Sequence, residues 1–397
     1  MKIAIFTDVF VPKVDGVVTS LEQLVLEFDR QGHQVLVVAP RTRGGPKNMG
    51  ENVQVFYVPS VPGIVYPDFR MGLLSLQLTK AIKEFSPEII QIPTVANVGW
   101  MGVFVARMLN IPAVGVFHGY FMKPEYLQVI GIKRGARFIE SIGWKYLRMM
   151  FGTCEAIVSP SGTVKQDLID HGFTNPVIVC PNGIRINTEK FRARSFSSLR
   201  KKYAIDPDKT VLYVGRVSKE KNLEGLLSVF RIVAQSNRDA KLFIVGDGPF
   251  RPELEELSRS YHLEKQVIFT GEMKHDELFR LGIYKLAKVF VTCSTSEVQP
   301  MSMIEALFYG LPIVASISQG MDELVRDGWN GYLVSANKPQ EYADKINLIL
   351  NNKQTADSFS TNSLERAKNF TVQHSAESYL ALFSKIRKEF AAHQEED

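Results

Sequence analysis

The chain has 397 residues, more than one ordinary hydrophobic core accommodates, so two domains are the default expectation. Its composition, 45% hydrophobic and 22% charged, is that of a soluble globular protein, and its longest apolar runs are far too short to span a membrane. A formal net charge of +5 does not indicate a nucleic-acid partner, although it suits a phosphate-bearing substrate or an anionic lipid surface. The chain enters a strand at once without a signal-peptide pattern, which predicts a cytoplasmic protein.

The first half of the chain alternates short β-branched runs with longer amphipathic segments. Strands are expected at residues 2–7, 34–39, 53–58, 88–91, 113–117, 156–159 and 177–179. Helices are expected near residues 18–31, 72–84, 99–109, 136–151 and 164–171. Continuous apolar strands joined by helical crossovers predict a parallel sheet covered on both faces.

A polar stretch rich in arginine, lysine and serine follows, and then the alternation restarts. Strands are expected at residues 210–214, 241–245, 266–269, 289–292 and 312–315, with helices at 222–234, 251–260, 275–281, 301–309, 341–350 and 376–390. The predicted organisation is a Rossmann-like domain over 1–185, a linker over 186–206, a second Rossmann-like domain over 207–370 and a C-terminal helix over 371–397 that packs back on the first. Two parallel-sheet domains in succession predict a ligand-binding cleft between the carboxyl ends of their strands.

Two glutamates eight residues apart, Glu297 and Glu305, form the strongest chemical pattern. Glu297 follows a predicted strand, and Pro300 lies where the next helix would begin. That helix start offers free amides and the positive end of a dipole to a diphosphate, while carboxylates accept hydrogen bonds from paired sugar hydroxyls. A surface glutamate and an ion-paired helical glutamate would fit the spacing equally well.

A second pattern, Gly215-Arg216 with Lys221, lies at a strand-to-helix corner. Arginine and lysine at such a corner suit a diphosphate that gains charge as its bond to a sugar breaks. Taken alone, the corner would more often be a solvated basic turn. The glycine-rich turns 246–249 and 269–272 also follow strands and could hold a nucleoside base through backbone contacts.

Two features of the first half point to the same edge of the sheet. Gly16 follows the first strand and would allow close approach of a backbone to a phosphate, although no G-x-G-x-x-G dinucleotide fingerprint is present. His118 ends a buried strand and could assist at a reacting centre. The other histidines (His33, His171, His262, His275, His374 and His393) are interpreted as structural or solvated, and the three cysteines (Cys154, Cys180 and Cys293) as small buried side chains.

In their order along the chain, these motifs resemble the family 4 glycosyltransferases of the GT-B architecture. The matching stretches are Gly16-Val17-Val18-Thr19-Ser20, Val116-Phe117-His118, Val158-Ser159-Pro160-Ser161, Pro181-Asn182-Gly183-Ile184, Gly215-Arg216 with Lys221-Asn222, Gly246-Asp247-Gly248-Pro249, Phe269-Thr270-Gly271 and the Glu297/Glu305 pair. The resemblance implies an α/β fold of two Rossmann-like domains facing across a cleft, and a retaining, metal-independent transfer from a nucleoside-diphosphate sugar.

The resemblance also implies roles for individual residues. Arg216 and Lys221 would bind the diphosphate, Glu297 the donor sugar and Glu305 the ribose. His118 would lie beside the sugar, and Gly16 would approach the donor phosphate. The remaining expected donor contacts are Val17, Gly246, Thr270, Met273, Gln299, Pro300, Met301 and Ser302.

The acceptor implied by the resemblance is a lipid, because the sequence is most similar to diacylglycerol glucosyltransferases and phosphatidylinositol mannosyltransferases. Cationic and aromatic residues interleave over 123–151, a pattern that fits a helix docked on anionic headgroups and equally a helix with its aromatics in the core. The best prediction is glucosyl transfer from UDP-glucose to diacylglycerol on the cytoplasmic face of the membrane.

Alternatives stay open at this point. They are a GDP-mannose-dependent mannosyltransferase, a transferase with a soluble acceptor, a sugar-nucleotide 2-epimerase and a non-catalytic sugar-nucleotide-binding subunit.

Overall fold

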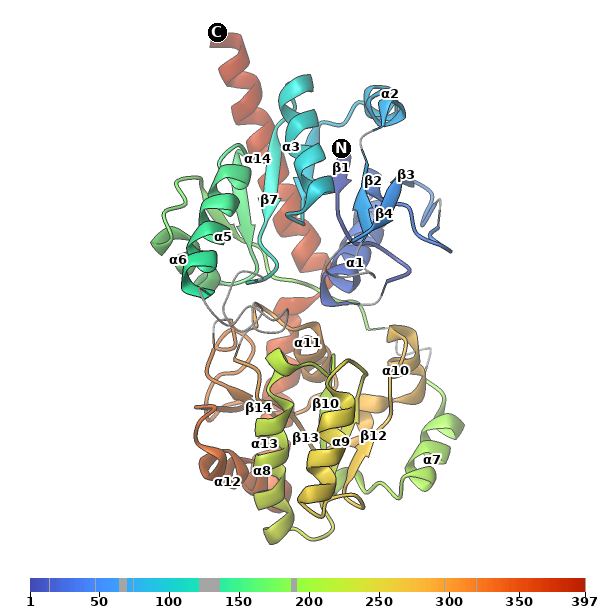
Figure 1. The fold of residues 1–397 in the computed structure, drawn as a ribbon, viewed down its shortest axis with the longest axis vertical. Helices are drawn as coiled ribbons and strands as arrows, with labels where there is room; N and C mark the ends of the chain where they lie inside the picture. The colour runs from blue at the N-terminus through green and yellow to red at the C-terminus, as the bar shows by residue number, and fades with distance from the viewer. Residues whose placement is uncertain are drawn as a thin grey trace. The chain divides into compact units, whose positions relative to one another are not determined.

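The computed structural model describes residues 1–13, 15–46, 48–63, 70–73, 75–120, 136–186, 191–295, 297–318 and 320–396. The chain divides into two compact units, shown in Figure 1. Unit 1 comprises Met1–Gly183 and Thr371–Asp397, and unit 2 comprises Ile184–Phe370.

Unit 1 is built on a seven-stranded sheet in which all neighbouring strands run parallel. In sheet order its strands are β3 (Val53–Val58), β2 (Gln34–Pro40), β1 (Lys2–Phe6), β6 (Ile89–Ile92), β7 (Ala113–Val116), β8 (Ala156–Ser159) and β9 (Val177–Val179). The central strands β6, β7 and β8 are buried along their whole length, as expected for a sheet covered on both faces.

Helices cover both faces of this sheet. They are α1 (Gly16–Arg30), α2 (Leu76–Phe85), α3 (Asn97–Leu109), α5 (Ala136–Phe151), α6 (Gly162–Asp170) and α14 (Val372–Glu396), and a short hairpin joins β4 (Ser60–Pro62) to β5 (Arg70–Gly72). Right-handed crossovers along β6, β7, β8 and β9 place α3, α5 and α6 on one face and α1 on the other. The C-terminal α14 packs on α1 (Figure 1). Between them, Phe383 meets Phe28 with ring centroids 6.2 Å apart.

Unit 2 repeats the architecture with a six-stranded parallel sheet. Its strands, in sheet order, are β12 (Val267–Phe269), β11 (Lys241–Val245), β10 (Thr210–Val214), β13 (Val289–Thr292), β14 (Ile313–Ser316) and β15 (Gly331–Val334). Its helices are α7 (Ala193–Lys202), α8 (Leu223–Ser236), α9 (Arg251–Ser260), α10 (His275–Leu281), α11 (Met301–Phe308), α12 (Pro339–Asn351) and α13 (Lys353–Ala367), with short 3₁₀ turns η2 (Pro207–Lys209), η3 (Lys219–Lys221), η4 (Ile283–Leu286) and η5 (Lys368–Phe370).

The segment expected to be a linker belongs to unit 2. Residues 187–190 lie outside the described part of the chain, but α7 follows them, and the Arg192 amide donates to the Arg280 carbonyl at 3.0 Å. Phe196, Leu199 and Tyr203, spaced three and four residues apart, pack against the unit 2 core, where the Tyr203 ring meets Phe243 of β11. A narrow apolar stripe is enough to pack a helix on a core. The sequence predicts a linker here because most residues of this segment are polar or charged.

The order of the strands reverses once in each sheet. In unit 1 the reversal falls between β1 and β6, and in unit 2 between β10 and β13. The loops that leave two such strands at their carboxyl ends run to opposite faces of the sheet and open a crevice between them, where ligands of open α/β sheets bind. Each unit therefore has one preferred position for a ligand.

Candidate functional site

The crevice of unit 2 brings a lysine and a glutamate together from distant parts of the chain. Lys221 ends η3 after β10, Glu297 follows β13, and Lys221 Nζ lies 2.6 Å from Glu297 Oε1. Both side chains are largely buried, with exposed fractions of 20% and 11%. Asn222 adopts a left-handed backbone conformation, caps α8 and donates its side-chain amide to the Cys293 carbonyl at 3.1 Å. The loops after β10 and β13 are thus tied together around this ion pair.

Glycines let the loop after β11 press against the loop after β10. A Cβ atom on Gly246, whose φ is +135°, would lie 1.9 Å from the Gly215 carbonyl oxygen, and one on Gly248 would lie 2.2 Å from the Val217 carbonyl oxygen. No side chain fits at such distances, so glycine is required there. The Arg216 side chain is exposed beside this contact, and its carbonyl accepts a hydrogen bond from Tyr213 Oη at 3.0 Å.

The start of α11 lies at the same edge, and the amides of its first turn lack intrahelical acceptors. The helix begins at Met301 with Pro300 at its N-cap, as the sequence predicts, and no side chain caps it and no acidic residue occupies its first turn. The Met303 amide donates to the Pro300 carbonyl at 3.1 Å, while Met301 and Ser302 occupy the turn whose amides lack intrahelical acceptors. Gln299, just before this turn, is buried. The helix dipole and these amides favour an anion.

Glu305, the second glutamate of the sequence pattern, has different partners from Glu297. Glu305, only 2% exposed, accepts a hydrogen bond from Tyr284 Oη and lies 2.7 Å from His275 Nε2. The sequence alone predicts a structural or solvated His275, but not its contact with Glu305. The signal that could have found it is position: His275 begins α10 after β12, at the same edge of the sheet as the other motifs.

The glycine-rich turn after β12 completes this edge. Gly246 donates its amide to the Gly271 carbonyl at 3.0 Å, which also accepts from Thr270 Oγ1 at 3.0 Å. Met273 is half-buried against the core. The predicted donor residues of unit 2 therefore come from the carboxyl ends of four neighbouring strands, β12, β11, β10 and β13.

The predicted residues of unit 1 lie at the carboxyl edge of its sheet. Gly16 and Val17 open α1, whose N-cap Asp15 accepts from the Val18 amide at 2.8 Å. His118 is half-buried just beyond β7, and burial lowers its pKa to about 4, so the imidazole is neutral near pH 7. A neutral imidazole can donate from one nitrogen and accept at the other.

A buried carboxylate at the reversal point of unit 1 has a structural role. Asp8 accepts from the Val98 amide at 2.7 Å, the Ala96 amide at 2.9 Å and the Thr94 hydroxyl at 2.7 Å. Burial raises the pKa of Asp8, and these hydrogen bonds oppose that rise. Because Ala96 at the N-cap of α3 makes no side-chain cap, Asp8 supplies the cap from the loop after β1.

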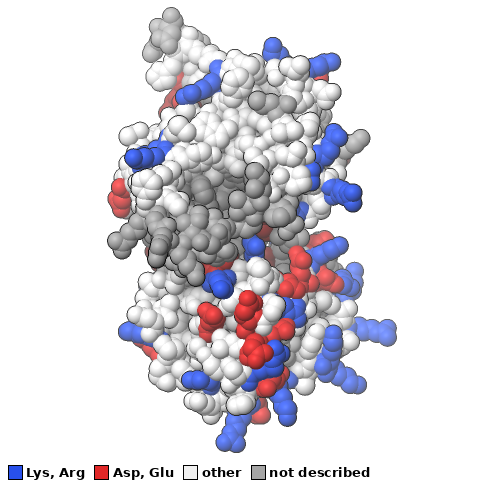
Figure 2. Space-filling model, viewed as in Figure 1, with Lys and Arg blue, Asp and Glu red and all other residues white. Residues whose placement is uncertain are grey.

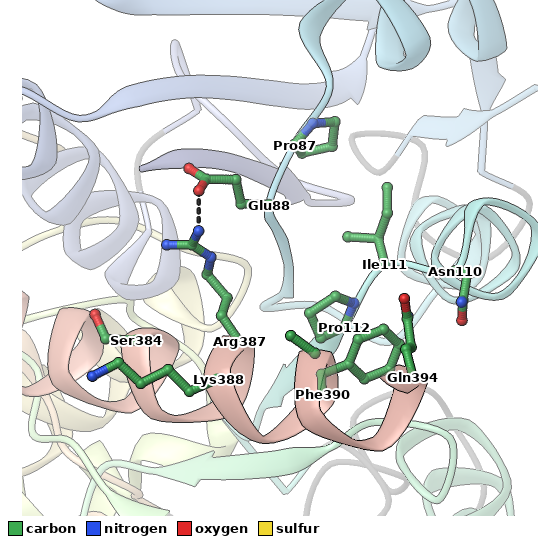
Figure 3. A pocket seen from close by; sticks show the side chains of 11 residues that line it. Pro87, Glu88, Asn110, Ile111, Pro112, Ser384, Arg387, Lys388, Phe390 and Gln394 are labelled. Atoms are coloured by element: carbon green, nitrogen blue, oxygen red, sulfur yellow. Dashed lines mark ion pairs between the residues drawn. The ribbon is translucent and has the colours of Figure 1, made fainter. Parts of the chain in front are cut away.

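A groove of about 640 Å³ lies at the opposite edge of the same sheet (Figure 3). Glu88 precedes β6 and Pro112 precedes β7, and Arg387 of α14 forms an ion pair with Glu88 across the groove. None of the predicted site residues lines it. This groove is therefore separate from the carboxyl edge where those residues gather.

Three further features of the described residues concern metal ligands, membrane spans and cysteines. No group of three histidines, cysteines or carboxylates gathers there in a way that could hold a metal ion. No helix within the described ranges is long and apolar enough to cross a membrane. The three cysteines are buried as expected, and burial raises the pKa of each thiol to about 12.

Both halves of the chain match known glycosyltransferase families. Residues 14–188 match Glycosyltransferase Family 4, and residues 195–366 match Glycosyl transferases group 1. The alpha-monoglucosyldiacylglycerol synthase of Streptococcus pneumoniae is 30% identical over 84% of this chain and 75% of the relative. The enzyme of the same name from Acholeplasma laidlawii is 28% identical over 98% and 99%, and a GDP-mannose-dependent alpha-mannosyltransferase of Corynebacterium glutamicum is 27% identical over 84% and 76%.

Solved structures share the fold. Anabaena Alr3699/HepE in complex with UDP-glucose matches with a TM-score of 0.76 at 20% identity, covering 97% of this chain and all of that one. Sucrose-phosphate synthase from Thermosynechococcus elongatus matches with a TM-score of 0.74 at 20% identity, over 98% and 99%. The chain has two successive parallel-sheet units, the motifs in their expected order and a 30% identical relative in Streptococcus pneumoniae. It therefore belongs to the family 4 glycosyltransferases of the GT-B fold and is a sugar-transferring enzyme.

Proposed function

We propose that this enzyme transfers glucose from UDP-glucose to a hydroxyl of a membrane glycerolipid such as diacylglycerol, with retention of the anomeric configuration. The observation that carries the proposal is the Lys221–Glu297 pair at the strand reversal of unit 2. Glu297 shortly precedes the start of α11, which no side chain caps. The names of the relatives from Streptococcus pneumoniae and Acholeplasma laidlawii support the choice of sugar and lipid.

In this proposal the diphosphate is bound by positive charge and backbone amides. Lys221 donates to Glu297 and carries a positive charge that attracts phosphate oxygens. Arg216 and the first-turn amides of Met301 and Ser302 supply further donors, with Gln299 and Pro300 shaping the approach. These groups stabilise the charge that builds on the leaving diphosphate as the bond to the sugar breaks, which lowers the barrier of the chemical step.

The sugar and ribose hydroxyls require acceptors. Glu297 keeps one carboxylate oxygen beyond its contact with Lys221, and we assign that oxygen to donor-sugar hydroxyls. Glu305 is assigned to the ribose, and Gly246, Thr270 and Met273 to the nucleoside. The roles implied for His118 at the sugar and for Gly16 and Val17 at the phosphate stay predictions.

Metal independence is part of the proposal, because Arg216 and Lys221 can supply the charge that a bound metal ion would otherwise bring. The expected result is an unchanged transfer rate after dialysis against EDTA. A rate that falls with EDTA and returns with added Mg²⁺ or Mn²⁺ would contradict this part of the mechanism.

The helical face of unit 1 supports a lipid acceptor through part of the interleaved cationic and aromatic pattern of 123–151, namely Phe138 and Lys145. Of the predicted aromatics on α5, Trp144 and Phe151 are buried and Tyr146 is hydrogen-bonded to Trp100 of α3 at 2.8 Å, so they belong to the fold. The predicted Lys123, Lys133 and Arg134 lie outside the described residues.

The exposed stripe of α5 is apolar apart from Ser141 and one cation. Phe138, Ile142 and Met149 are 70%, 47% and 60% exposed, and Lys145 is exposed beside them. Phe104 and Met108 are exposed on the neighbouring α3. Among the described residues, Figure 2 shows few charges in the middle of this face of unit 1 and lysines and arginines at its margins. Such a surface fits the boundary between headgroups and acyl chains of an anionic membrane.

A second candidate is mannosyl transfer from GDP-mannose, favoured by the similarity to the Corynebacterium glutamicum mannosyltransferase. Both activities would use the same Lys221–Glu297 site. They differ in the donor base and in the sugar, so the donor itself distinguishes them.

The test is a transfer assay with radiolabelled UDP-glucose, UDP-galactose and GDP-mannose, each offered to vesicles of diacylglycerol in phosphatidylglycerol or to soluble sugars. We expect label from UDP-glucose in the organic phase. Label from GDP-mannose alone would favour the second candidate, and label confined to water-soluble products would refute a lipid acceptor. Conversion of the donor in a control without acceptor would indicate an epimerase.

A matched pair of variants tests the membrane surface. Ile142→Ser with Met149→Ser should reduce co-sedimentation with phosphatidylglycerol vesicles and leave UDP binding unchanged, because both side chains are on the outer stripe of α5. Leu348→Ser, an exposed apolar change on α12 of unit 2, is the control and should leave vesicle binding unchanged.

A further inference from the structure

The carboxylate of Glu305 is buried without a lysine or arginine partner among the described residues. Its side chain is only 3% exposed, and its partners are the Tyr284 hydroxyl at Oε2 and His275 Nε2 at Oε1. A buried carboxylate is costly unless hydrogen bonds satisfy it. These two side chains therefore hold the buried carboxylate of Glu305 in one orientation.

Tyr284 is a fixed hydrogen-bond donor to Glu305. It lies in η4, is 1% exposed, and its pKa is raised well above 10 by burial and then by the charge of Glu305. The phenol therefore stays protonated and donates. Its ring stacks on Tyr309, with centroids 5.4 Å apart and planes at 16°, so its direction is set by packing.

His275 is held in place from the other side. Its ring meets Phe279 edge-on at 4.7 Å and 83°, and Phe279 stacks on Tyr309 at 6.2 Å and 12°. A continuous series of rings thus links the two groups that contact Glu305. His275 keeps 23% of its side chain exposed, so it lies between the buried carboxylate and the solvent.

We propose that His275 and Tyr284 are positioning residues that orient Glu305 for the ribose of the donor nucleotide. Each carboxylate oxygen has two lone-pair sites, and the network uses one on each oxygen. One site on each oxygen therefore remains, enough to accept from the two vicinal ribose hydroxyls. This inference rests on the proposed function, which assigns the ribose to Glu305.

The test measures binding of UDP and of 2′,3′-dideoxy-UDP by calorimetry, with GDP and its dideoxy analogue used if the wild-type chain binds only GDP. His275→Ala and Tyr284→Phe should each weaken UDP binding by about tenfold, the usual effect of removing a hydrogen bond to a charged group. Binding of the dideoxy analogue should not change, because it offers Glu305 no hydroxyl. Adding His275→Ala to Glu305→Ala should cost nothing further.

Two controls separate positioning from a merely structural role. His275→Gln retains a side-chain N–H donor and should recover part of the lost UDP affinity, whereas His374→Ala, an exposed histidine of α14, should behave as wild type. An equal loss for UDP and for the dideoxy analogue, or wild-type affinity in both variants, would overturn the inference. If Glu305→Ala itself binds UDP normally, the ribose assignment in the proposed function fails instead.

Discussion

The ion pair between Lys221 and Glu297 offers the sharpest perturbation of the proposed site. Lys221→Met and Glu297→Gln each remove one charge while approximately preserving side-chain length, and the double variant removes both. The two residues lie 76 positions apart, and their contact joins the loops after β10 and β13. The ion pair therefore belongs both to the fold and to the proposed site. Stability and catalysis can therefore be measured on the same variants.

The separation of 2.6 Å sets the scale of the effect. Two unit charges at that distance attract by about 2 kcal/mol in bulk water and about 6 kcal/mol at an effective dielectric constant of about 20. Desolvation of side chains that are 20% and 11% exposed offsets much of this attraction. We expect a net coupling of about 1–3 kcal/mol between the two residues in the free energy of unfolding.

Catalysis should respond more strongly than stability. Lys221→Met should lower kcat by about 10²–10³-fold, the effect of removing one donor that faces developing negative charge. The assay is steady-state transfer with saturating donor, together with urea unfolding of both single variants and the double variant. Lys219→Met, which removes the exposed lysine at the start of the same turn η3, is the matched control and should retain full activity.

Two results would refute this reasoning. A Lys221→Met variant with kcat within about threefold of wild type would show that the lysine does not face the leaving group. A coupling below about 0.5 kcal/mol in the double-variant cycle would show that the contact contributes nothing measurable to folding.

Three further predictions concern the fold around the site. Gly246→Ala would place a Cβ atom 1.9 Å from the Gly215 carbonyl oxygen and should reduce the free energy of unfolding in urea by about 2–4 kcal/mol; a loss below about 0.5 kcal/mol would contradict the close packing. Asp8→Ala should cost about 2–4 kcal/mol, because it leaves the start of α3 and the Thr94 hydroxyl without their acceptor, and hydrogen exchange should show faster opening of α3. The pKa of His118 is about 4 in the folded state and about 6.5 in the unfolded state. As pH falls from 6.5 to 4, mainly the unfolded state binds this proton. The free energy of unfolding therefore falls across that window, by on the order of 2–3 kcal/mol from this group. His118→Asn should flatten that part of the stability–pH curve, and an unchanged slope would show that His118 is solvated.

Much of the fold could be predicted from local sequence patterns. The alternation of β-branched runs and amphipathic segments located most strands to within a residue, and β8, β10 and α9 have the predicted bounds. The patterns missed β15 and α13, which lack a strong local signal. Glu297 and Lys221 were identified because each is close in sequence to a strand end, and in a parallel sheet the carboxyl ends of strands meet at one edge.

The sequence by itself determined two α/β domains, the order of the motifs and the family to which the chain belongs, because backbone periodicity and short loop motifs are local properties. Only the tertiary structure decided which partners those motifs acquire. Tyr284 and His275 reach Glu305 from 21 and 30 residues away, and α7 joins unit 2 through a few apolar side chains in a polar stretch. Such contacts depend on which strands become neighbours in the sheet and how helices pack on them, and no local pattern of residues encodes that arrangement.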